Sequence, residues 1–204
     1  METKVLDIES VMRDVGAWHT GHFLLSSGMH SDQYMQCQRL LQYPRHGLAV
    51  AELLVEKVLE AGLKPRTVAG PALGAVHWEL LVAMALDKAL PPGEPVRGIF
   101  AERPDGEFEI RRGIEIQPGE EILVVEDVTT TGGSARKVVE LIRKLGGRPV
   151  GVGAIIDRSG GSVSFDVPFI KLLTLKLSNY QPDECVMCRD GKPVTKPGTT
   201  KHKA

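Results

Sequence analysis

The sequence is poor in the features that mark several large classes of protein. Aromatic residues make up only 5% of its 204 residues, so few side chains could stack on the bases of single-stranded nucleic acid. No apolar run approaches the ~18 residues that a membrane helix needs. With 25 basic and 26 acidic residues, the net charge of −1 gives no general attraction to nucleic acid or to a membrane. Any anionic ligand must therefore be held by local groups.

Cysteine is also scarce, and its three positions are Cys37, Cys185 and Cys188. Three are too few for a disulfide framework, and the acidic N-terminal segment lacks the apolar stretch of a signal peptide, so we expect a cytoplasmic protein. The Cys185-x-x-Cys188 pair could supply two zinc ligands, but a closed zinc site needs four. Cys37 is distant in sequence and His202 lies in the tail. Unless two subunits pool their pairs, we interpret both cysteines as ordinary thiols.

The alternation of apolar and polar segments predicts the fold. Short apolar strands are expected at 67–70, 96–101, 122–125, 150–156 and 169–175, with helices at 44–63, from 70–74 to about 90, and at 135–145. Strands and helices that alternate in this way favour an α/β fold with a doubly wound, mostly parallel sheet.

Three further segments surround this predicted core. A helix over 6–16 and a small hairpin within 23–37 would form an N-terminal hood over residues 1–40. The polar, Arg- and Glu-rich stretch 102–118 is expected to be a flap outside the hydrophobic core. We therefore predict a hood at 1–40, a core at 41–181 and a loosely ordered tail at 182–204.

The strongest local signal is the segment VVEDVTTTGGS at 124–134. Its strand delivers Glu126 and Asp127 to the carboxyl edge of the sheet, where open α/β sheets bind their ligands. The following glycines let the backbone approach a ligand, and the next helix N-terminus favours a phosphate. Two carboxylates would repel a phosphate in the same pocket. We therefore expect them beside the phosphate pocket, where they would accept hydrogen bonds from sugar hydroxyls or contact a hydrated magnesium ion. This pattern describes a site for a ribose 5-phosphate.

Other phosphate-binding motifs are missing from the sequence. It contains neither GKS nor GKT of a Walker loop, and no GxGxxG. Instead, VVEDVTTTGGSA resembles the phosphoribosyl pyrophosphate motif of type I phosphoribosyltransferases. The segments GHFLLSSGMHSDQY, VAGPALGA, FAERPDGEFEIRRG and IIDRSGG resemble the orotate-using members of that family. The resemblance runs from about residue 6 to residue 197.

The resemblance implies an enzyme that transfers ribose 5-phosphate from phosphoribosyl pyrophosphate to orotate. The products would be orotidine 5-monophosphate and pyrophosphate, in pyrimidine (UMP) biosynthesis, with Mg²⁺ carried by the substrate. It implies that Glu126 and Asp127 bind the ribose diol. The 5-phosphate loop would consist of Val128, Thr129, Thr130, Thr131, Gly132, Gly133 and Ser134. The pyrophosphate loop would consist of Gly70, Pro71, Ala72, Leu73 and Gly74.

The resemblance also assigns the base site and the flap. Orotate would be held by Thr130, by Arg158 and by the hood backbone, and a guanidinium can grip its carboxylate with two hydrogen bonds. The flap closes over the neighbouring subunit's site in this family, which implies a homodimer. Family flaps carry lysines and a histidine, but here only arginines remain to act on the pyrophosphate. The hood residues are Ser26, Ser27 and Gly28. The flap arginines are Arg103, Arg111 and Arg112, and we assign Arg103 to catalysis.

Two alternatives stay open at this point. The protein could use the same chemistry on another base, in which case Arg158 would lack a carboxylate to bind. It could also be a non-catalytic regulator that binds phosphoribosyl pyrophosphate, which the loss of flap lysines would favour. A second departure from the family lies at His77 and Trp78, where small apolar residues are usual; we interpret His77 as a partly buried structural residue and Trp78 as packing.

Overall fold

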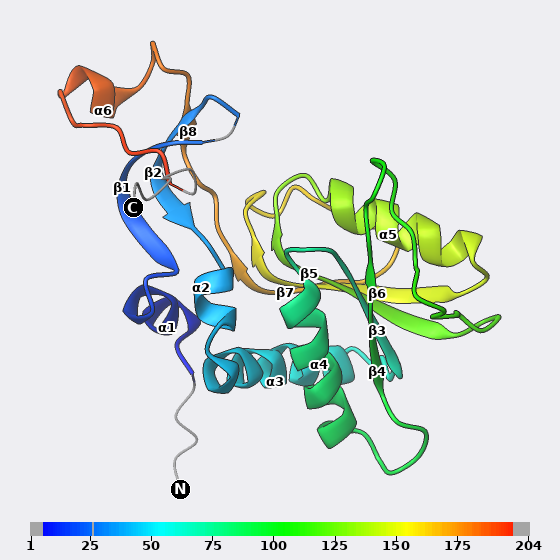
Figure 1. Ribbon diagram of the computed structural model, residues 1–204. Helices are drawn as coiled ribbons and strands as arrows, with labels where there is room; N and C mark the ends of the chain where they lie inside the picture. The colour runs from blue at the N-terminus through cyan, green and yellow to red at the C-terminus, as the bar shows by residue number, and fades with distance from the viewer. Residues whose placement is uncertain (1–5, 26, 198–204) are drawn as a thin grey trace, which may run out of the picture. The chain divides into compact units, whose positions relative to one another are not determined.

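The computed structural model describes residues 6–25 and 27–197 of the chain (Figure 1). These residues fall into two compact units. Among the described residues, the sheet unit contains 41–175, and the hood unit combines 7–40 with 176–197. The hood unit is therefore built from both ends of the sequence, whereas we had divided the chain into consecutive segments at residues 40 and 181.

The sheet unit is organised around five parallel strands, which confirms the predicted α/β class. Their order across the sheet is β4 (Arg97–Ala101), β3 (Thr67–Pro71), β5 (Glu121–Thr129), β6 (Arg148–Asp157) and β7 (Phe169–Thr174). Strand β5 is longer than the predicted 122–125, because its pairing with β6 continues to Thr129 opposite Asp157. The acidic pair thus lies within the strand's last residues.

Helices cover both faces of this sheet, as a doubly wound fold requires. Figure 1 shows α3 (Pro44–Glu60) and α4 (Val76–Ala89) on one face and α5 (Gly133–Lys144) on the other. Pro44 occupies the first turn of α3, where a missing N–H costs nothing. The α5 face packs Val138 and Ile142 against buried strand residues such as Val124. No helix among the described residues is long and apolar enough to span a membrane.

The flap, residues 102–118, is less detached than its polar composition predicts. Glu102 and Glu109 exchange two backbone hydrogen bonds of 2.9 Å, which closes a short antiparallel turn. Phe108 is buried in the core, and Ile110, Ile114 and Ile116 pack against it. The expectation that this stretch lies outside the core was therefore wrong for these apolar residues. Residues 103–107 are exposed, as a flap tip requires.

The hood unit contains a small antiparallel sheet with the order β1 (Trp18–Leu24), β2 (His30–Met35) and β8 (Asn179–Tyr180). Its helices are α1 (Ile8–Asp14) and α6 (Val186–Arg189), and the short α2 (Gln38–Leu41) lies at the boundary between the units. The predicted hairpin is present as β1 and β2.

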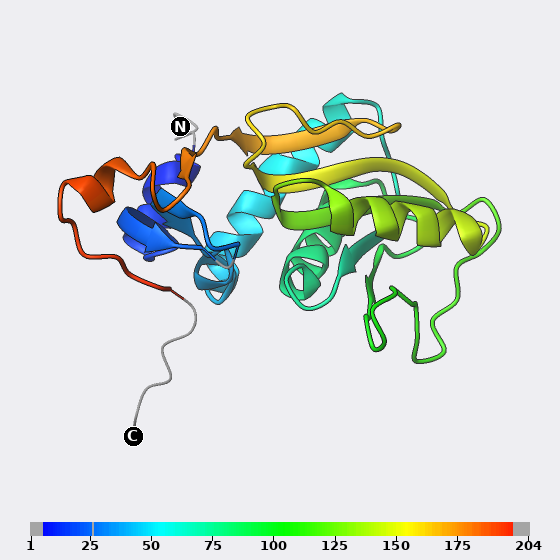
Figure 2. The ribbon, with the colours of Figure 1, turned by 90° about the horizontal axis from the view of Figure 1, so that it is seen from above.

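The C-terminal segment of the hood unit is folded onto that hairpin. The backbone of Thr195 donates to His22 and accepts from Leu24, with N···O distances of 2.8 and 2.9 Å. Figure 2 shows β8 and α6, in orange and red, beside the blue β1 and β2. The tail that we expected to be loosely ordered thus has backbone partners as far as Thr195. These partners lie more than 140 residues away in sequence, beyond the reach of local pattern.

Candidate active site

The two carboxyl groups of β5 occupy the carboxyl edge of the sheet, as predicted. Glu126 accepts hydrogen bonds from the Ser134 hydroxyl and the Ala135 N–H at the start of α5. Burial, and then the neighbouring Asp127 charge, raise the pKa of Glu126 to about 7. Burial also raises the pKa of Asp127, although its carboxylate accepts the Val128 N–H at 2.9 Å. Both groups are therefore set to ionise more fully when a cation or new donors approach.

The loop after β5 has the shape expected of a phosphate cradle. Gly132 adopts φ 75°, and a Cβ there would lie only 3.0 Å from Val163 Cγ1, so both conformation and space require glycine. Thr130 and Thr131 are exposed and Ser134 is half-buried. The hydroxyl of Thr129 is buried, so this residue can offer a ligand no side-chain donor. The first N–H groups of α5, which begins at Gly133, add the positive end of the helix dipole.

The predicted pyrophosphate loop lies beside these carboxylates. It begins with the last two residues of β3, and a Cβ on Gly74 would lie 3.5 Å from Asp127 Oδ1, which places the two segments in direct proximity. Gly70 packs so closely on α4 that a Cβ would lie 2.9 Å from that of Ala75. The peptide bond between Ala72 and Leu73 is cis, and the Leu73 side chain is exposed. The loop is thus held by the sheet at one end and opens to solvent at its tip.

Arg158 lies at the carboxyl end of the next strand, β6. Its N–H donates to the Thr129 carbonyl at 2.8 Å, so it is fixed beside the phosphate loop. The preceding Asp157 is fully buried and accepts from the Ser159 N–H and hydroxyl and from Lys171 at 3.0 Å. Burial would raise the pKa of Asp157, but these donors outweigh it and lower the pKa. Lys171, which no sequence pattern indicated, thus supports this edge.

The predicted hood residues lie in the other unit. Ser27 and Gly28 are exposed in the turn between β1 and β2, where Gly28 has φ 82° and donates to the Leu25 carbonyl at 3.0 Å. Ser26 lies outside the described residues. The contribution of these three residues to a base site stays a prediction.

The three flap arginines are all engaged within the flap. Arg103 donates to the Gly106 carbonyl at 2.6 Å and lies over the Phe108 ring. Arg112 pairs with both carboxylate oxygens of Glu102, at 2.7 and 3.2 Å, and this contact lowers the pKa of Glu102. Arg111 lies 3.9 Å from the same carboxylate. Two of the three arginines thus face the carboxylate of Glu102.

Two predictions about the start of α4 have different outcomes. Trp78 is fully buried, which confirms packing as its role. His77 is exposed rather than partly buried, because it lies on the outer side of the first helical turn. Sequence analysis did not single out the neighbouring Glu79. Its side chain is buried against Gly98, and desolvation raises its pKa to about 8.

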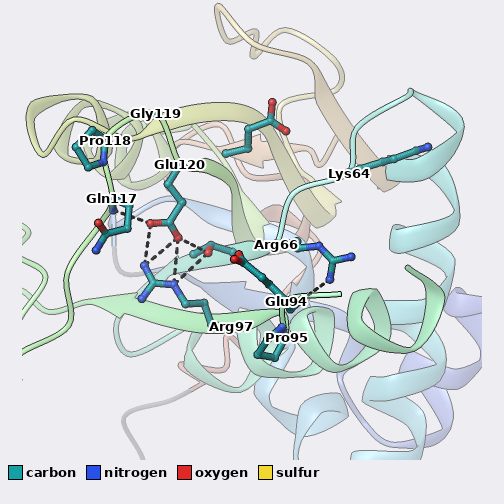
Figure 3. Close-up of a pocket in the computed structure, with 11 residues that line it drawn as sticks. Lys64, Arg66, Glu94, Pro95, Arg97, Gln117, Pro118, Gly119 and Glu120 are labelled. Atoms are coloured by element: carbon teal, nitrogen blue, oxygen red, sulfur yellow. Dashed lines mark hydrogen bonds and ion pairs between the residues drawn. The ribbon is translucent and has the colours of Figure 1, made fainter. Parts of the chain in front are cut away.

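A pocket of about 600 Å³ lies at the opposite, amino edge of the sheet (Figure 3). Figure 3 shows Arg97 and Glu120 pointing toward one another across it. Arg97 Nη2 contacts the two carboxylate oxygens of Glu120 at 2.8 and 2.9 Å, and Glu120 also accepts from Thr67 and from the Gln117 N–H. Because these charges satisfy each other at the edge where ligands do not bind in such sheets, we assign the network to stability.

Comparison with known proteins identifies the family. The phosphoribosyl transferase domain family matches residues 36–182. The orotate phosphoribosyltransferase of Caldanaerobacter subterraneus subsp. tengcongensis is 44% identical over 198 residues, which cover 97% of each chain. The crystal structure of the Aeropyrum pernix enzyme of the same name superposes with a TM-score of 0.62 at 26% identity, covering 82% of this chain and 93% of that one.

A third relative carries a ligand. Mycobacterium tuberculosis orotate phosphoribosyltransferase in complex with 5-phospho-α-D-ribosyl 1-diphosphate superposes with a TM-score of 0.53 at 26% identity, over 70% of this chain and 81% of that one. The chain therefore belongs to the phosphoribosyltransferase family and, within it, groups with the orotate phosphoribosyltransferases.

Proposed function

We propose that this protein transfers ribose 5-phosphate from phosphoribosyl pyrophosphate to orotate and releases pyrophosphate, as its relatives' name describes. The observation that carries the proposal is the carboxyl edge of the sheet. There the β5 carboxylates adjoin the loop at 70–74 on one side and the loop at 128–134 on the other. A ligand with a phosphate at one end, a pyrophosphate at the other and a diol between them matches this order of anion, carboxylate and anion sites.

The reaction displaces pyrophosphate from the anomeric carbon of the ribose, and the attacking group is a ring nitrogen of the base. The chain therefore needs no nucleophile of its own, and its task is to orient the sugar and stabilise charge. We assign the ribose hydroxyls to Glu126 and Asp127, whose oxygens accept hydrogen bonds. Backbone N–H groups and exposed hydroxyls of 130–134 would bind the 5-phosphate.

Magnesium is part of the proposal. Two adjacent carboxyl groups with raised pKa values form a donor set that suits a hydrated divalent cation, because such a cation offsets the cost of ionising both. Glu126 and Asp127 would hold the hydrated ion through hydrogen bonds. Bound to the leaving pyrophosphate, magnesium would supply charge neutralisation.

The flap arginines would act by exchanging partners. The side chains of Arg111 and Arg112 are 50% and 67% exposed, and solvent screens such surface ion pairs strongly. Leaving Glu102 for a pyrophosphate would therefore cost little. We further propose that the flap serves the neighbouring subunit of a homodimer, and that the enzyme works in the cytoplasm, where its three free thiols would stay reduced.

Base selection is assigned to Arg158 and to the hood turn. Arg158 is fixed beside the 5-phosphate loop by its backbone, and its guanidinium can bind the orotate carboxylate with two parallel hydrogen bonds. A base without a carboxylate would leave that guanidinium without a matching anion, which favours orotate over uracil.

The direct test offers orotate, uracil, adenine and hypoxanthine separately to the purified protein with phosphoribosyl pyrophosphate and magnesium, and measures nucleotide formation. Turnover with orotate alone is expected. Arg158→Ala should lower kcat/KM for orotate by about 10²-fold, because it removes a charged hydrogen-bonding partner. Arg143→Ala, at the far end of α5 and paired on the surface with Asp166, is the matched control. Turnover with a different base would reject the assigned specificity, and binding without turnover would indicate a regulator.

A further inference from the structure

The hood unit brings together four side chains of the type that bind zinc. They are His22 on β1, His30 at the start of β2, and Cys185 and Cys188 around the short helix α6. One potential ligand atom from each residue lies within 4.8 Å of all the others. These atoms come from positions up to 166 residues apart, so their convergence is a product of the fold and not of a local motif.

The distances between these atoms approach those around a tetrahedral zinc ion. With Zn–S bonds of about 2.3 Å and Zn–N bonds of about 2.0 Å, neighbouring ligand atoms lie about 3.3–3.8 Å apart. Cys185 Sγ and Cys188 Sγ lie 3.5 and 3.7 Å from His22 Nε2, and Cys188 Sγ lies 3.3 Å from His30 Nδ1. His22 Nε2 and His30 Nδ1 are closer, at 2.7 Å, and would have to separate to admit the ion.

The surroundings of His22 orient its ring for this role. Its Nδ1 lies 2.8 Å from the carbonyl oxygen of Lys192, which can only accept a hydrogen bond. Nδ1 therefore carries the proton, and Nε2 presents its lone pair to the two thiols and to His30. Zinc-binding histidines are commonly held in this way by a carbonyl on the ring nitrogen that faces away from the metal.

Backbone pairing positions the two histidines and the carbonyl that holds His22. His30 pairs with Leu24, two residues after His22 on the neighbouring strand, and the two imidazole ring centroids lie 4.7 Å apart. Lys192, which supplies the carbonyl, follows Gly191 in a left-handed turn and donates to the Met187 carbonyl at 2.9 Å. His22, His30 and Cys185 are buried, which gives a closed site of low polarity.

We propose that His22, His30, Cys185 and Cys188 form a structural zinc site. Two thiolates and two neutral imidazoles complete a four-coordinate shell with no position left for a substrate, so the site stabilises the hood and takes no part in chemistry. The position of the zinc site indicates which segments of the hood unit it would join. His22 and His30 flank the turn that contains Ser27 and Gly28, while the cysteines anchor the C-terminal segment, which is otherwise joined to β1 and β2 by few backbone bonds.

The test measures the metal in the full-length protein, purified without a histidine tag under reducing conditions. Wild type and Cys37→Ala are expected to carry about one zinc ion per chain, and Cys188→Ser almost none. Cys188 is exposed, so its serine variant should keep the fold, and Cys37 is the third cysteine of the hood unit but lies outside the cluster. This inference is independent of the proposed reaction, because the readout is bound metal.

Two further measurements decide the ligands and the role. Replacement by cobalt(II) should produce the visible absorption of a tetrahedral site and thiolate charge transfer, both absent in Cys188→Ser. A chelator should lower the Tm of wild type and leave that of Cys188→Ser unchanged. A wild-type protein that binds no zinc after supply of the metal, or one isolated with a Cys185–Cys188 disulfide, would overturn the proposal.

Discussion

The cradle of the sheet unit and the ligand cluster of the hood unit differ in how the sequence encodes them. The cradle, residues 124–134, is consecutive in sequence: the end of the strand, the acidic pair, the threonines and the glycines follow one another. The cluster joins His22 and His30 to two cysteines more than 150 residues later, through strand pairing at β2 and β8. A site formed by one turn can be found by its motif, whereas a site formed by folding has to be located in space.

The largest effect is expected at the centre of the cradle. Asp127→Asn keeps the shape of the side chain but removes its charge, and kcat/KM for orotate should fall by about 10²–10³-fold, or about 3–4 kcal/mol. The Tm should change little. Asp166→Asn, which alters an exposed carboxylate of the same unit, should leave kcat/KM within about twofold. Equal effects from the two variants would remove Asp127 from the site.

The second largest effect on activity is expected from the flap arginines. Arg103→Ala should lower kcat by about 10–100-fold, because it removes a cation that would neutralise the leaving pyrophosphate. Arg103 contacts only Gly106 and the face of the Phe108 ring from the exposed flap, so the Tm should change little. Steady-state kinetics of Arg103→Ala, Arg111→Ala and Arg112→Ala identify the acting residue. If all three retain wild-type kcat, the flap has no electrostatic role.

The acidic pair gives ligand binding at the cradle a pH dependence. Because the pKa of Glu126 is raised to about 7, its carboxyl is protonated below that pH and a poorer partner for a hydrated cation. Affinity for the magnesium complex of phosphoribosyl pyrophosphate should therefore fall by up to about tenfold for each pH unit below 7. Calorimetric titration between pH 5.5 and 8 measures it, and Glu126→Gln should flatten the profile. A wild-type profile as flat as that of the variant contradicts this assignment.

A smaller effect is expected at Glu79, outside both sites. Its folded-state pKa of about 8 exceeds the unfolded value near 4.5, so the folded protein retains a proton that the unfolded chain releases. Its contribution to stability is complete below pH 4.5 and is lost as pH rises toward 8. Glu79→Gln cannot ionise and should gain about 3 kcal/mol relative to wild type between pH 5 and pH 8. Denaturant unfolding at both pH values tests this, and a constant difference would refute it.

The contrast between local motifs and contacts made by folding also explains which features could be predicted from the sequence. The parallel sheet, its three helices and the cradle follow from periodicity and from glycines beside strand ends, which are local properties. The anchoring of the flap had a weaker signal in the alternation of Phe108, Ile110, Ile114 and Ile116, which its charges obscured. The two-residue strand β8, the support of Asp157 by Lys171 and the approach of both histidines to the cysteines depend on contacts between distant segments. No local pattern records such contacts.

The central claim, that the carboxyl edge of this sheet binds phosphoribosyl pyrophosphate, is tested most directly by a crystal structure with that compound and magnesium. The account predicts the 5-phosphate against residues 130–134, the ribose hydroxyls at Glu126 and Asp127, and the pyrophosphate at 70–74. Density for the ligand elsewhere, for example in the pocket beside Arg97 at the amino edge of the sheet, would contradict it.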